Sequence, residues 1–415
     1  MKSWRRPEVQ RLPGQGQVPR IWNTASGRLE VAQPSPASAG TAGLYVCGIT
    51  PYDSTHIGHA ATYLAYDTLI RLWLDAGLTV VYVQNTTDVD DPLLERAAAT
   101  GVDWRTLADE QTERYRTDME RLGIIPPDHY IAVTERIDAI AAAIAGLIDR
   151  GIAYRLGDDV YFDSAAAARV SPWQLGDESH FDRATMLALT AERGGDPDRP
   201  GKRDALDPVL WRGPRDDDPT WPSVIGQGRP GWHIECAVIS AEFLHLPFAV
   251  NGGGEDLIFP HHEFTAGHAA AITGEQLASI HSHAGLVAYH GEKMSKSLGN
   301  LVFVSDLVES GVDPRAIRLA ILSQRYRFDW EWKDALLATA LDRLARWSEW
   351  ASSVAQDESA ANEPSALLTR LRETLADDLD SPAAIDSVDA AIASGVPPTL
   401  VDLEAIHALL GIDLR

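Results

Sequence analysis

The sequence predicts an α/β fold in which a parallel sheet carries a nucleotide site. Residues 44–46 read as the end of a buried strand, and a turn with glycine and proline leads from them into a helix over 57–75 with apolar residues at helical spacing. An apolar, β-branched run follows at 78–83 and ends in polar residues. Strand, helix and parallel strand make half of a nucleotide-binding α/β unit.

The turn after the first strand has the character of a phosphate site. In α/β sheets, phosphates bind where a strand ends in such a turn and feeds the N-terminus of a helix. The segment 44–62 also carries a thiol, two imidazoles and several hydroxyls. These groups could bind a metal ion and a nucleotide side by side.

The remaining elements are taken in chain order. Residues 1–43 are expected to form an N-terminal arm with one short strand pair, and helices are expected at 92–99, 104–122 and 133–150. Residues 151–230 lose clear periodicity and predict an inserted lobe with long surface loops. The sheet resumes near 248–251, followed by a helix from 263 and a strand near 280–288. Helices are then expected at 304–310, 313–325, 333–354, 365–378, 381–394 and 398–410.

Composition narrows the class of protein. The chain has 415 residues, enough for two or three domains, and its 45% apolar and 23% charged content is typical of a soluble globular protein. No apolar run approaches the ~20 residues that span a bilayer, and the N-terminus lacks the apolar stretch of a secretory signal, so a cytoplasmic enzyme without a membrane partner is expected. A net charge of −24 argues against a nucleic-acid partner without excluding a local basic groove.

Two histidines three residues apart open the first long helix. His56 and His59 share one helical face, and Gly58 lets a phosphate approach the backbone. The alternative is a pair of capping or core histidines.

A second phosphate-binding candidate lies at residues 291–300. Lys293 and Lys296 are interleaved with serines and flanked by glycines, which suits a mobile loop that clamps a triphosphate. The alternative is a solvated basic loop, which fits this very acidic chain less well.

The two cysteines suggest a metal site. Cys47, Cys236 and His261 could supply two thiolates and an imidazole to Zn²⁺, and three scattered ligands without a fourth indicate an open coordination position. Three glycines at 252–254 would let a ribose lie against the backbone, with Asp256 taking its hydroxyls. The alternatives are core packing for the thiols and the imidazole and a plain turn for the glycines.

These words together resemble the class I aminoacyl-tRNA synthetases, whose HIGH and KMSKS signatures match residues 56–59 and 293–297 in the right order. Longer words at 47–53, 85–91, 231–236 and 252–263 resemble cysteinyl-tRNA synthetase in particular. The resemblance implies a Rossmann-like catalytic domain, a connective insertion, a KMSKS loop and a C-terminal helical bundle. It also implies a zinc ion that binds the substrate thiolate, with Cys47, Cys236 and His261 as its ligands.

Four departures separate the chain from those synthetases. Thr265 stands where the family has a carboxylate ligand, the chain ends at Arg415 soon after the bundle, the net charge is −24, and the insertion carries the word ERGGDP at 192–197. These departures resemble the cysteine ligases of mycothiol synthesis. That resemblance implies activation of L-cysteine with ATP and transfer of the cysteinyl group to the amine of glucosaminyl-inositol, without tRNA.

The resemblance also assigns roles to residues. Charge on the triphosphate, which carries Mg²⁺, would be stabilised by His56, His59, Lys293 and Lys296. Contacts to ATP and the cysteinyl-adenylate would come from Cys47, Gly48, Ile49, Thr50, Thr62, Asn85, Thr86, Thr87, Trp232, Gly254, Glu255, Asp256 and Val287. Thr50 and Trp232 are the candidates for holding the amino-acid part, with core packing as the alternative for Trp232. Asp88 and Asp90 are weak candidates for the general base, and both have a structural alternative.

The expected organisation is an arm over 1–43, the first half of the catalytic domain over 44–150, a connective insertion over 151–230, the second half over 231–303 and a helical bundle over 304–415. A monomer is expected. Two other functions stay open: a truncated cysteinyl-tRNA synthetase, and a paralogue that senses zinc or cysteine without catalysis. Thr265 and the acidic charge argue against the first, and the triphosphate-binding words argue against the second.

Overall fold

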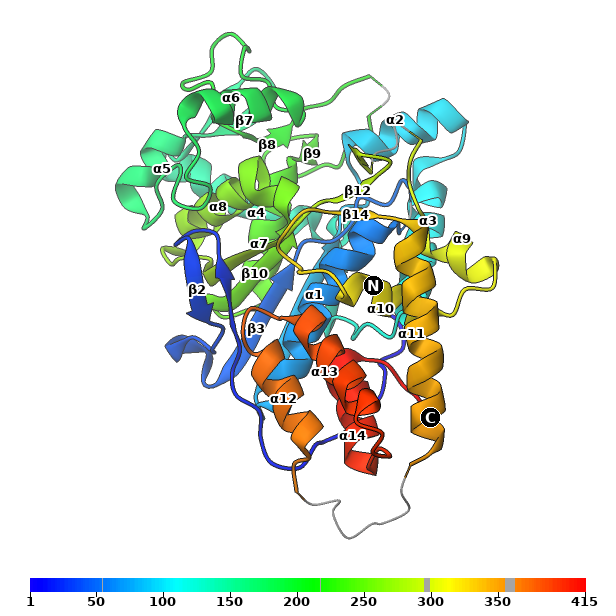
Figure 1. The fold of residues 1–415 in the computed structure, drawn as a ribbon. Coiled ribbons are helices and arrows are strands. Elements are labelled where there is room, and N and C mark those ends of the chain that lie inside the picture. Colours follow the sequence, from blue (N-terminus) through cyan, green and yellow to red (C-terminus); the bar gives the residue numbers. More distant parts are fainter. Residues whose placement is uncertain (54, 217, 295–298, 355–362) are drawn as a thin grey trace.

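The computed structural model describes residues 1–53, 55–216, 218–294, 299–354 and 363–415 (Figure 1). Its centre is a five-stranded, all-parallel sheet in the order β11-β10-β3-β4-β5. Because the strand order reverses between β3 and β10, the carboxyl ends of these two strands flank the crevice where such sheets bind ligands. The predicted α/β class is confirmed. The strands are β3 (Thr41–Val46), β4 (Thr79–Thr86), β5 (His129–Ala132), β10 (Phe248–Gly254) and β11 (Ala278–Ala284).

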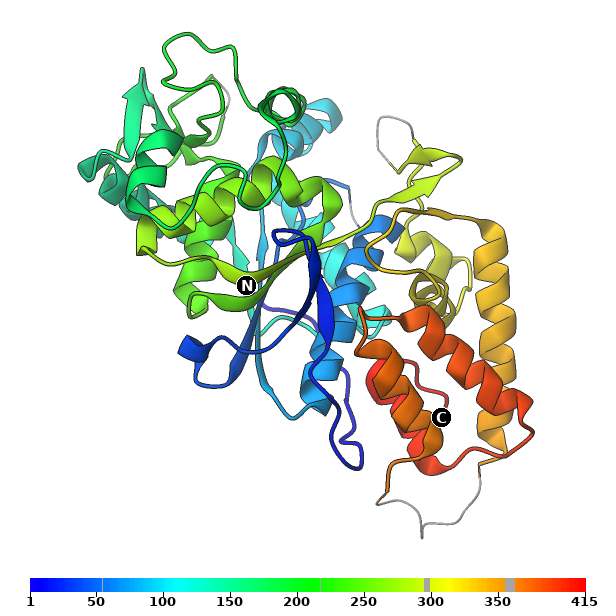
Figure 2. The same ribbon diagram turned by 60° about the vertical axis from the view of Figure 1, so that its left-hand side comes forward.

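Both faces of the sheet are buried, as expected of parallel strands. Leu44 and Val46 of β3 belong to a core shared with α1 (Ile57–Asp75) and the C-terminal helices. Tyr45 and Cys47 belong to a second core, formed with α4 (Ile137–Asp149), α7 (Trp232–Phe243) and α8 (Glu263–Thr273). Figure 2 shows the inserted lobe and the C-terminal helices at opposite ends of the molecule.

The helices between β4 and α4 begin at acidic caps. Asp90 precedes α2 (Asp91–Thr100), and Asp103 precedes α3 (Trp104–Arg121), each accepting a hydrogen bond from a free N–H of the first turn. These elements agree with the predicted ranges to within a residue. The helix predicted over 133–150 instead starts as a 3-10 turn, η2 (Val133–Arg136), because Arg136 has non-helical dihedral angles.

The inserted lobe is more ordered than the sequence predicts. An antiparallel sheet and two helices occupy the stretch where long surface loops are expected. Its strands are two to four residues long, too short for a visible period, and are held partly by ion pairs: the buried carboxylate of Asp159 binds Arg199 and Arg215. The elements are β6 (Ala153–Leu156), β7 (Asp159–Phe162), α5 (Ser164–Val170), α6 (Arg183–Glu192), β8 (Val209–Arg212) and β9 (Arg229–Pro230).

Glu263, the first residue of α8, ties this lobe to the catalytic sheet. Its fully buried carboxylate accepts four hydrogen bonds from the lobe: from Trp173 Nε1 at 3.1 Å, Gly176 N at 2.9 Å, Ser179 N at 2.9 Å and Ser179 Oγ at 2.8 Å. Four donors on one carboxylate offset the cost of burying it. The segment 173–179 is thereby held against the start of α8.

The two ends of the chain flank the sheet. The N-terminal arm contains the expected strand pair, β1 (Arg20–Asn23) and β2 (Arg28–Val31), followed by η1 (Pro36–Ser38). The strand predicted over 280–288 is two strands, because Gly285 N–H donates to Tyr326 O and the chain leaves the central sheet there. A three-stranded sheet follows, formed by β12 (Val287–Tyr289), β13 (Glu292–Lys293) and β14 (Trp330–Trp332).

The predicted C-terminal helices are present. The helix predicted over 398–410 changes to π geometry at residue 406. Within the described residues, no helix is long and apolar enough to cross a membrane. The helices are α9 (Val304–Glu309), α10 (Pro314–Leu322), α11 (Asp334–Ser352), α12 (Ala366–Leu375), α13 (Ser381–Ala393), α14 (Leu400–Ala405) and η7 (Ile406–Leu410).

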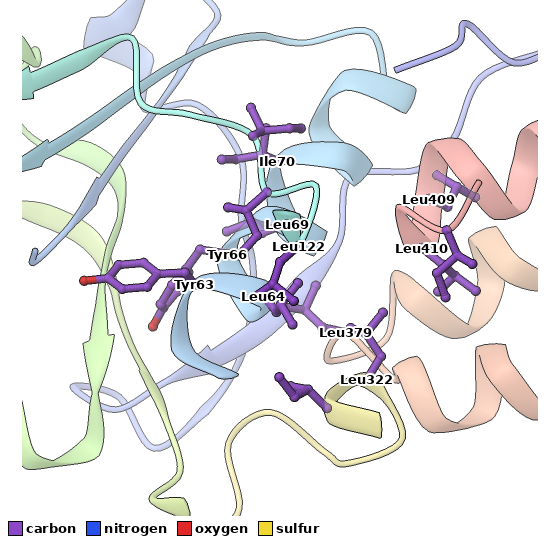
Figure 3. Close-up of a cluster of buried hydrophobic side chains, with 14 of the residues drawn as sticks. Tyr63, Leu64, Tyr66, Leu69, Ile70, Leu122, Leu322, Leu379, Leu409 and Leu410 are labelled. Atoms are coloured by element: carbon purple, nitrogen blue, oxygen red, sulfur yellow. The ribbon is translucent and has the colours of Figure 1, made fainter. Parts of the chain in front are cut away.

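The C-terminal helices are fixed to α1 by apolar contacts and by buried charges. Figure 3 shows leucines of α1 and of the C-terminal segments in one cluster with Leu122, the residue that follows α3. Beside it, Asp67 binds both Arg71, at 2.8 Å, and Arg318. Burial opposes the ionisation of Asp67, but the two guanidinium groups hold its pKa below the ordinary value. Burial lowers the pKa of Arg318 to about 10, so this group is still a cation at neutral pH.

We expect Asp67→Asn to destabilise the protein by about 3–5 kcal/mol, because it leaves two buried guanidinium groups without a counter-charge. Equilibrium denaturant unfolding measures this loss. Arg370→Ala is the matched control, since it breaks an exposed pair with Glu373 and should change stability by less than about 0.5 kcal/mol. Equal effects of the two substitutions would contradict a structural role for the buried cluster.

Candidate active site

The site begins at the turn that follows β3. Cys47 N–H donates to Gly252 O at 3.1 Å, which continues the ladder between β3 and β10 by one residue. Gly48 N–H donates to Asn85 Oδ1 of β4 at 2.9 Å. A β-carbon at Gly48 would lie 1.6 Å from Asn85 O, so only glycine fits this turn. Three neighbouring strands therefore fix the turn in place.

Cys47, Cys236 and His261 converge behind this turn. The two sulfurs are 3.9 Å apart, and Cys47 Sγ lies 3.3 Å from His261 Nε2. All three residues are buried, and their ligand atoms lie within 4.8 Å of one another. Among the described residues, these side chains form the one group of three or more histidine, cysteine or acidic residues that lie close enough together to hold a metal ion.

The donor set and its spacing fit a tetrahedral ion. Thiolates at 2.3 Å from Zn²⁺ would lie about 3.8 Å apart in a tetrahedron, close to the 3.9 Å between the two sulfurs. Burial, together with the hydrogen bond shared with Cys236, raises the pKa of Cys47 well above the ordinary value. Burial opposes the ionisation of Cys236, but the hydrogen bond from Cys47 and the nearby His261 hold its pKa well below that value. Within the pair, Cys47 is the hydrogen-bond donor and Cys236 the acceptor.

Tryptophan and histidine side chains contact two of the three candidate ligands, His261 and Cys47. Trp232 stacks on His261 with ring centres 4.2 Å apart, and His233 Nδ1 lies 3.1 Å from His261 Nδ1. His262 Nε2 lies 3.2 Å from Cys47 Sγ, and its other nitrogen lies 2.7 Å from His283 Nε2. Such outer contacts fix ring orientation at metal sites. The functional hypotheses assigned no role to His233, His262 or His283, although the first two lie inside the words that pointed to the ligands.

Thr265 takes no place among the candidate ligands. Its side chain is fully buried, and its hydroxyl donates to His233 O at 3.3 Å. A hydroxyl engaged with a carbonyl, one helical turn after His261, is a poor ligand compared with a carboxylate. Among the described residues, the chain therefore supplies three candidate ligands, one fewer than a tetrahedral ion takes.

The two histidines of the HIGH word sit at the N-terminus of α1. His56 caps the helix, with Nδ1 accepting from Gly58 N–H at 3.1 Å, and its ring stacks on His59 with centres 3.9 Å apart. Burial lowers the pKa of His59 to about 4, so the ring is neutral at pH 7. His56 therefore caps the helix, which is the alternative that the sequence left open for it. The helix N-terminus at this position also favours anions.

A second group of predicted residues surrounds this helix start. A β-carbon on Gly254 would lie 2.7 Å from Asp256 Oδ1 and 3.9 Å from Thr62 Oγ1, so these three residues are neighbours. Asn85 Nδ2 donates to Thr87 Oγ1 at 3.0 Å, and Thr87 N–H donates to Ile49 O at 3.0 Å.

The other predicted positions lie on separate elements. Val287 starts β12 and accepts a hydrogen bond from Met294 N–H at 3.1 Å, and Lys293 ends β13. Lys296 lies outside the described residues. Thr50 follows Ile49 in the turn after β3, and Thr86 ends β4 between Asn85 and Thr87. Glu255 starts η3 (Glu255–Leu257).

Asp88 and Asp90, the weak candidates for a general base, both have structural partners. Asp88 accepts hydrogen bonds from the backbone and the hydroxyl of Thr134, and Asp90 caps α2. Burial raises the pKa of both carboxyls. The structural alternative accounts for the contacts of both residues.

The fold and this site define a catalytic domain of the class I synthetase type. The family model described as "tRNA synthetases class I (C) catalytic domain" matches residues 33–342. Among solved structures, methionyl-tRNA synthetase of Mycobacterium tuberculosis in complex with methionyl-adenylate has a TM-score of 0.64 and 18% identity, covering 89% of this chain and 88% of that one. The Agrobacterium radiobacter K84 LeuRS ternary complex has a TM-score of 0.60 and 12% identity, covering 91% and 84%. These two similarities concern the fold alone.

The particular family follows from nearer relatives. A Clavibacter michiganensis subsp. michiganensis protein named L-cysteine:1D-myo-inositol 2-amino-2-deoxy-alpha-D-glucopyranoside ligase is 59% identical over 423 residues, covering 100% of this chain and 99% of its own. The Thermobispora bispora protein of the same name is 54% identical over 418 residues, covering 100% of both. Within the class I synthetase type, the chain belongs to the family of these ligases.

We expect Cys236→Ala to lose its bound metal, because only two of the three ligands remain. Metal per chain, measured by atomic emission on the purified variant, should fall far below that of the wild type. Thr265→Ser is the matched control, since it keeps the hydroxyl that donates to His233 O and should retain the metal. A Cys236→Ala variant with wild-type metal content would contradict the site.

His59 gives a second, pH-dependent test. Because its pKa is near 4 in the folded chain and 6.5 ordinarily, the unfolded state takes up the proton first as pH falls, and stability is lost between pH 6.5 and 4. Replacing His59 by Asn removes this loss. Relative to the wild type, the variant should gain up to roughly 2 kcal/mol between pH 7 and pH 5 in urea unfolding. A difference that does not change with pH would contradict a neutral, buried His59.

Proposed function

We propose that the protein is an ATP-dependent ligase that activates L-cysteine as cysteinyl-adenylate and transfers it to the amine of glucosaminyl-inositol, forming an amide and releasing AMP and pyrophosphate. The supporting observation is the convergence of Cys47, Cys236 and His261 beside a nucleotide turn, with Thr265 in place of a fourth ligand. The printed names of the relatives support the same reaction.

The metal is proposed to be Zn²⁺, since two thiolates and an imidazole form a soft donor set. When bound, it supplies selectivity for a thiolate substrate over the hydroxyl of serine. Trp232, which stacks on His261, and Thr50 are proposed to hold the amino-acid part of the substrate. Trp232 is the first residue of α7, the helix that also contains Cys236. Thr50 lies in the nucleotide turn, three residues after Cys47.

The nucleotide is proposed to lie across the carboxyl ends of β3 and β10. Its ribose would bind Asp256 beside Gly254, and its triphosphate, with Mg²⁺, would lie at the N-terminus of α1. There His59 acts as a neutral hydrogen-bond donor and the helix supplies free N–H groups, while Lys293 and Lys296 supply the positive charge from the KMSKS loop.

The chemistry has two steps. A carboxylate oxygen of cysteine attacks the α-phosphorus of ATP, and the bond to pyrophosphate breaks. The amine of the acceptor then attacks the carbonyl carbon of the adenylate, the bond to AMP breaks, and the amine loses a proton. Positioning of the two reactants supplies much of the rate, because each step joins groups held in the same crevice.

The acceptor decides between this function and that of a tRNA synthetase. Enzyme preloaded with cysteine and radiolabelled ATP is mixed with glucosaminyl-inositol or with tRNA, and product is followed in a single turnover. We expect cysteinyl amide and AMP with the amino-sugar and no cysteinyl-tRNA. Glucosyl-inositol, which carries a hydroxyl in place of the amine, is the matched control and should form no amide. Formation of cysteinyl-tRNA would overturn the proposal.

A further inference from the structure

The ERGGDP word at 192–197 has no role in the mechanism above. It begins at the last residue of α6 (Arg183–Glu192), and Arg193 caps the end of that helix. The guanidinium of Arg193 donates two hydrogen bonds out of the lobe, to the carbonyl oxygens of Asp256 and Phe259. These carbonyls lie between the proposed ribose contact and the metal ligand His261.

The two carbonyls need a donor from elsewhere because the helix there is broken. η3 (Glu255–Leu257) runs into η4 (Ile258–His262), but Phe259 has extended dihedral angles of −141° and 138°. An extended residue interrupts the regular hydrogen bonds of a helix, and buried carbonyls are rarely left without a partner. One planar guanidinium carries several donors and can bind a carbonyl on each side of the break.

The rest of the word holds the lobe together. Asp196 binds Lys202 at 3.1 Å and the hydroxyl of Tyr161, both within the lobe. Gly194 has a φ of +80°, which L-residues rarely adopt, and the chain turns back there so that Gly195 N–H donates to Thr190 O. The turn and the Asp196 contacts therefore fix the end of α6, from which Arg193 reaches the catalytic half.

We propose that Arg193 is a positioning residue that sets the placement of Asp256 relative to His261, and so holds the nucleotide and the metal ends of the site in register. The inference rests on the proposed function for the meaning of Asp256 and His261. The two hydrogen bonds that Arg193 donates to this segment go to backbone carbonyls, so it acts through the segment 256–261 and not on substrate. The inserted lobe thereby becomes part of the apparatus that forms the adenylate.

The test compares Arg193→Ala and Arg193→Lys with Arg183→Ala. Arg183 lies at the other end of α6 and pairs with Asp204 inside the lobe, so its loss perturbs the lobe alone. The readouts are KM for ATP, KM for cysteine and kcat in cysteine-dependent pyrophosphate exchange, with metal content per chain. In Arg193→Ala we expect KM for ATP to rise roughly ten- to a hundredfold, a partial recovery in Arg193→Lys, retained metal, and no change in KM for Arg183→Ala.

Two results would overturn the inference. One is a lower kcat with both KM values unchanged, which is the outcome for a variant that is only partly folded. The other is the same rise in KM in Arg183→Ala. If the wild type itself shows no exchange, the proposed function fails, and calorimetric binding of ATP to wild type and Arg193→Ala then decides the inference separately. Equal affinities would overturn it.

Discussion

The hydrogen bond from Cys47 N–H to Gly252 O lies where the strand order of the sheet reverses, and the whole site depends on it. It fixes one thiol against the glycines of β10, whose chain continues directly to His261. A slip of one residue between β3 and β10 would turn Cys47 to the opposite face. The sulfur would then lie away from Cys236 and His261, and the Gly48 turn would lose its place against Asn85.

The two faces of the sheet accommodate buried polar groups in different ways. Behind the site, thiols and imidazoles contact one another, and burial lowers the pKa of rings such as His268 and His283, to about 3 in each case. On the other face, Arg71 and Arg318 divide their donors between Asp67 and main-chain carbonyls. The first arrangement keeps soft ligands available for a metal, and the second fixes the C-terminal segment to α1.

The parts of the structure that the sequence predicts correctly are those with a signal in a short stretch of residues, such as periodicity or a motif. The strand, turn and helix over 44–75 have their own periodicity, and residue type together with family resemblance predicts the three candidate ligands, which the structure brings together. The inserted lobe was expected, but its strands were not, because strands of two to four residues have no period to detect. His261 and His262 are adjacent and alike in sequence. Both imidazoles contact Cys47 Sγ, at 3.3 and 3.2 Å, and only the folded chain shows that His261 is the one grouped with both cysteines.

The four hydrogen bonds that Glu263 accepts from residues 173–179 have a consequence for how the lobe can be inherited. An inserted segment is transferable between proteins when only its two ends connect it to the host. Excision of this lobe would remove all four donors from a carboxylate that lies one residue from His262 and two from the candidate ligand His261. A recombinant lobe that covered Glu263 without matching donors would leave a buried, unsatisfied carboxylate, so the lobe and the sheet are expected to change together.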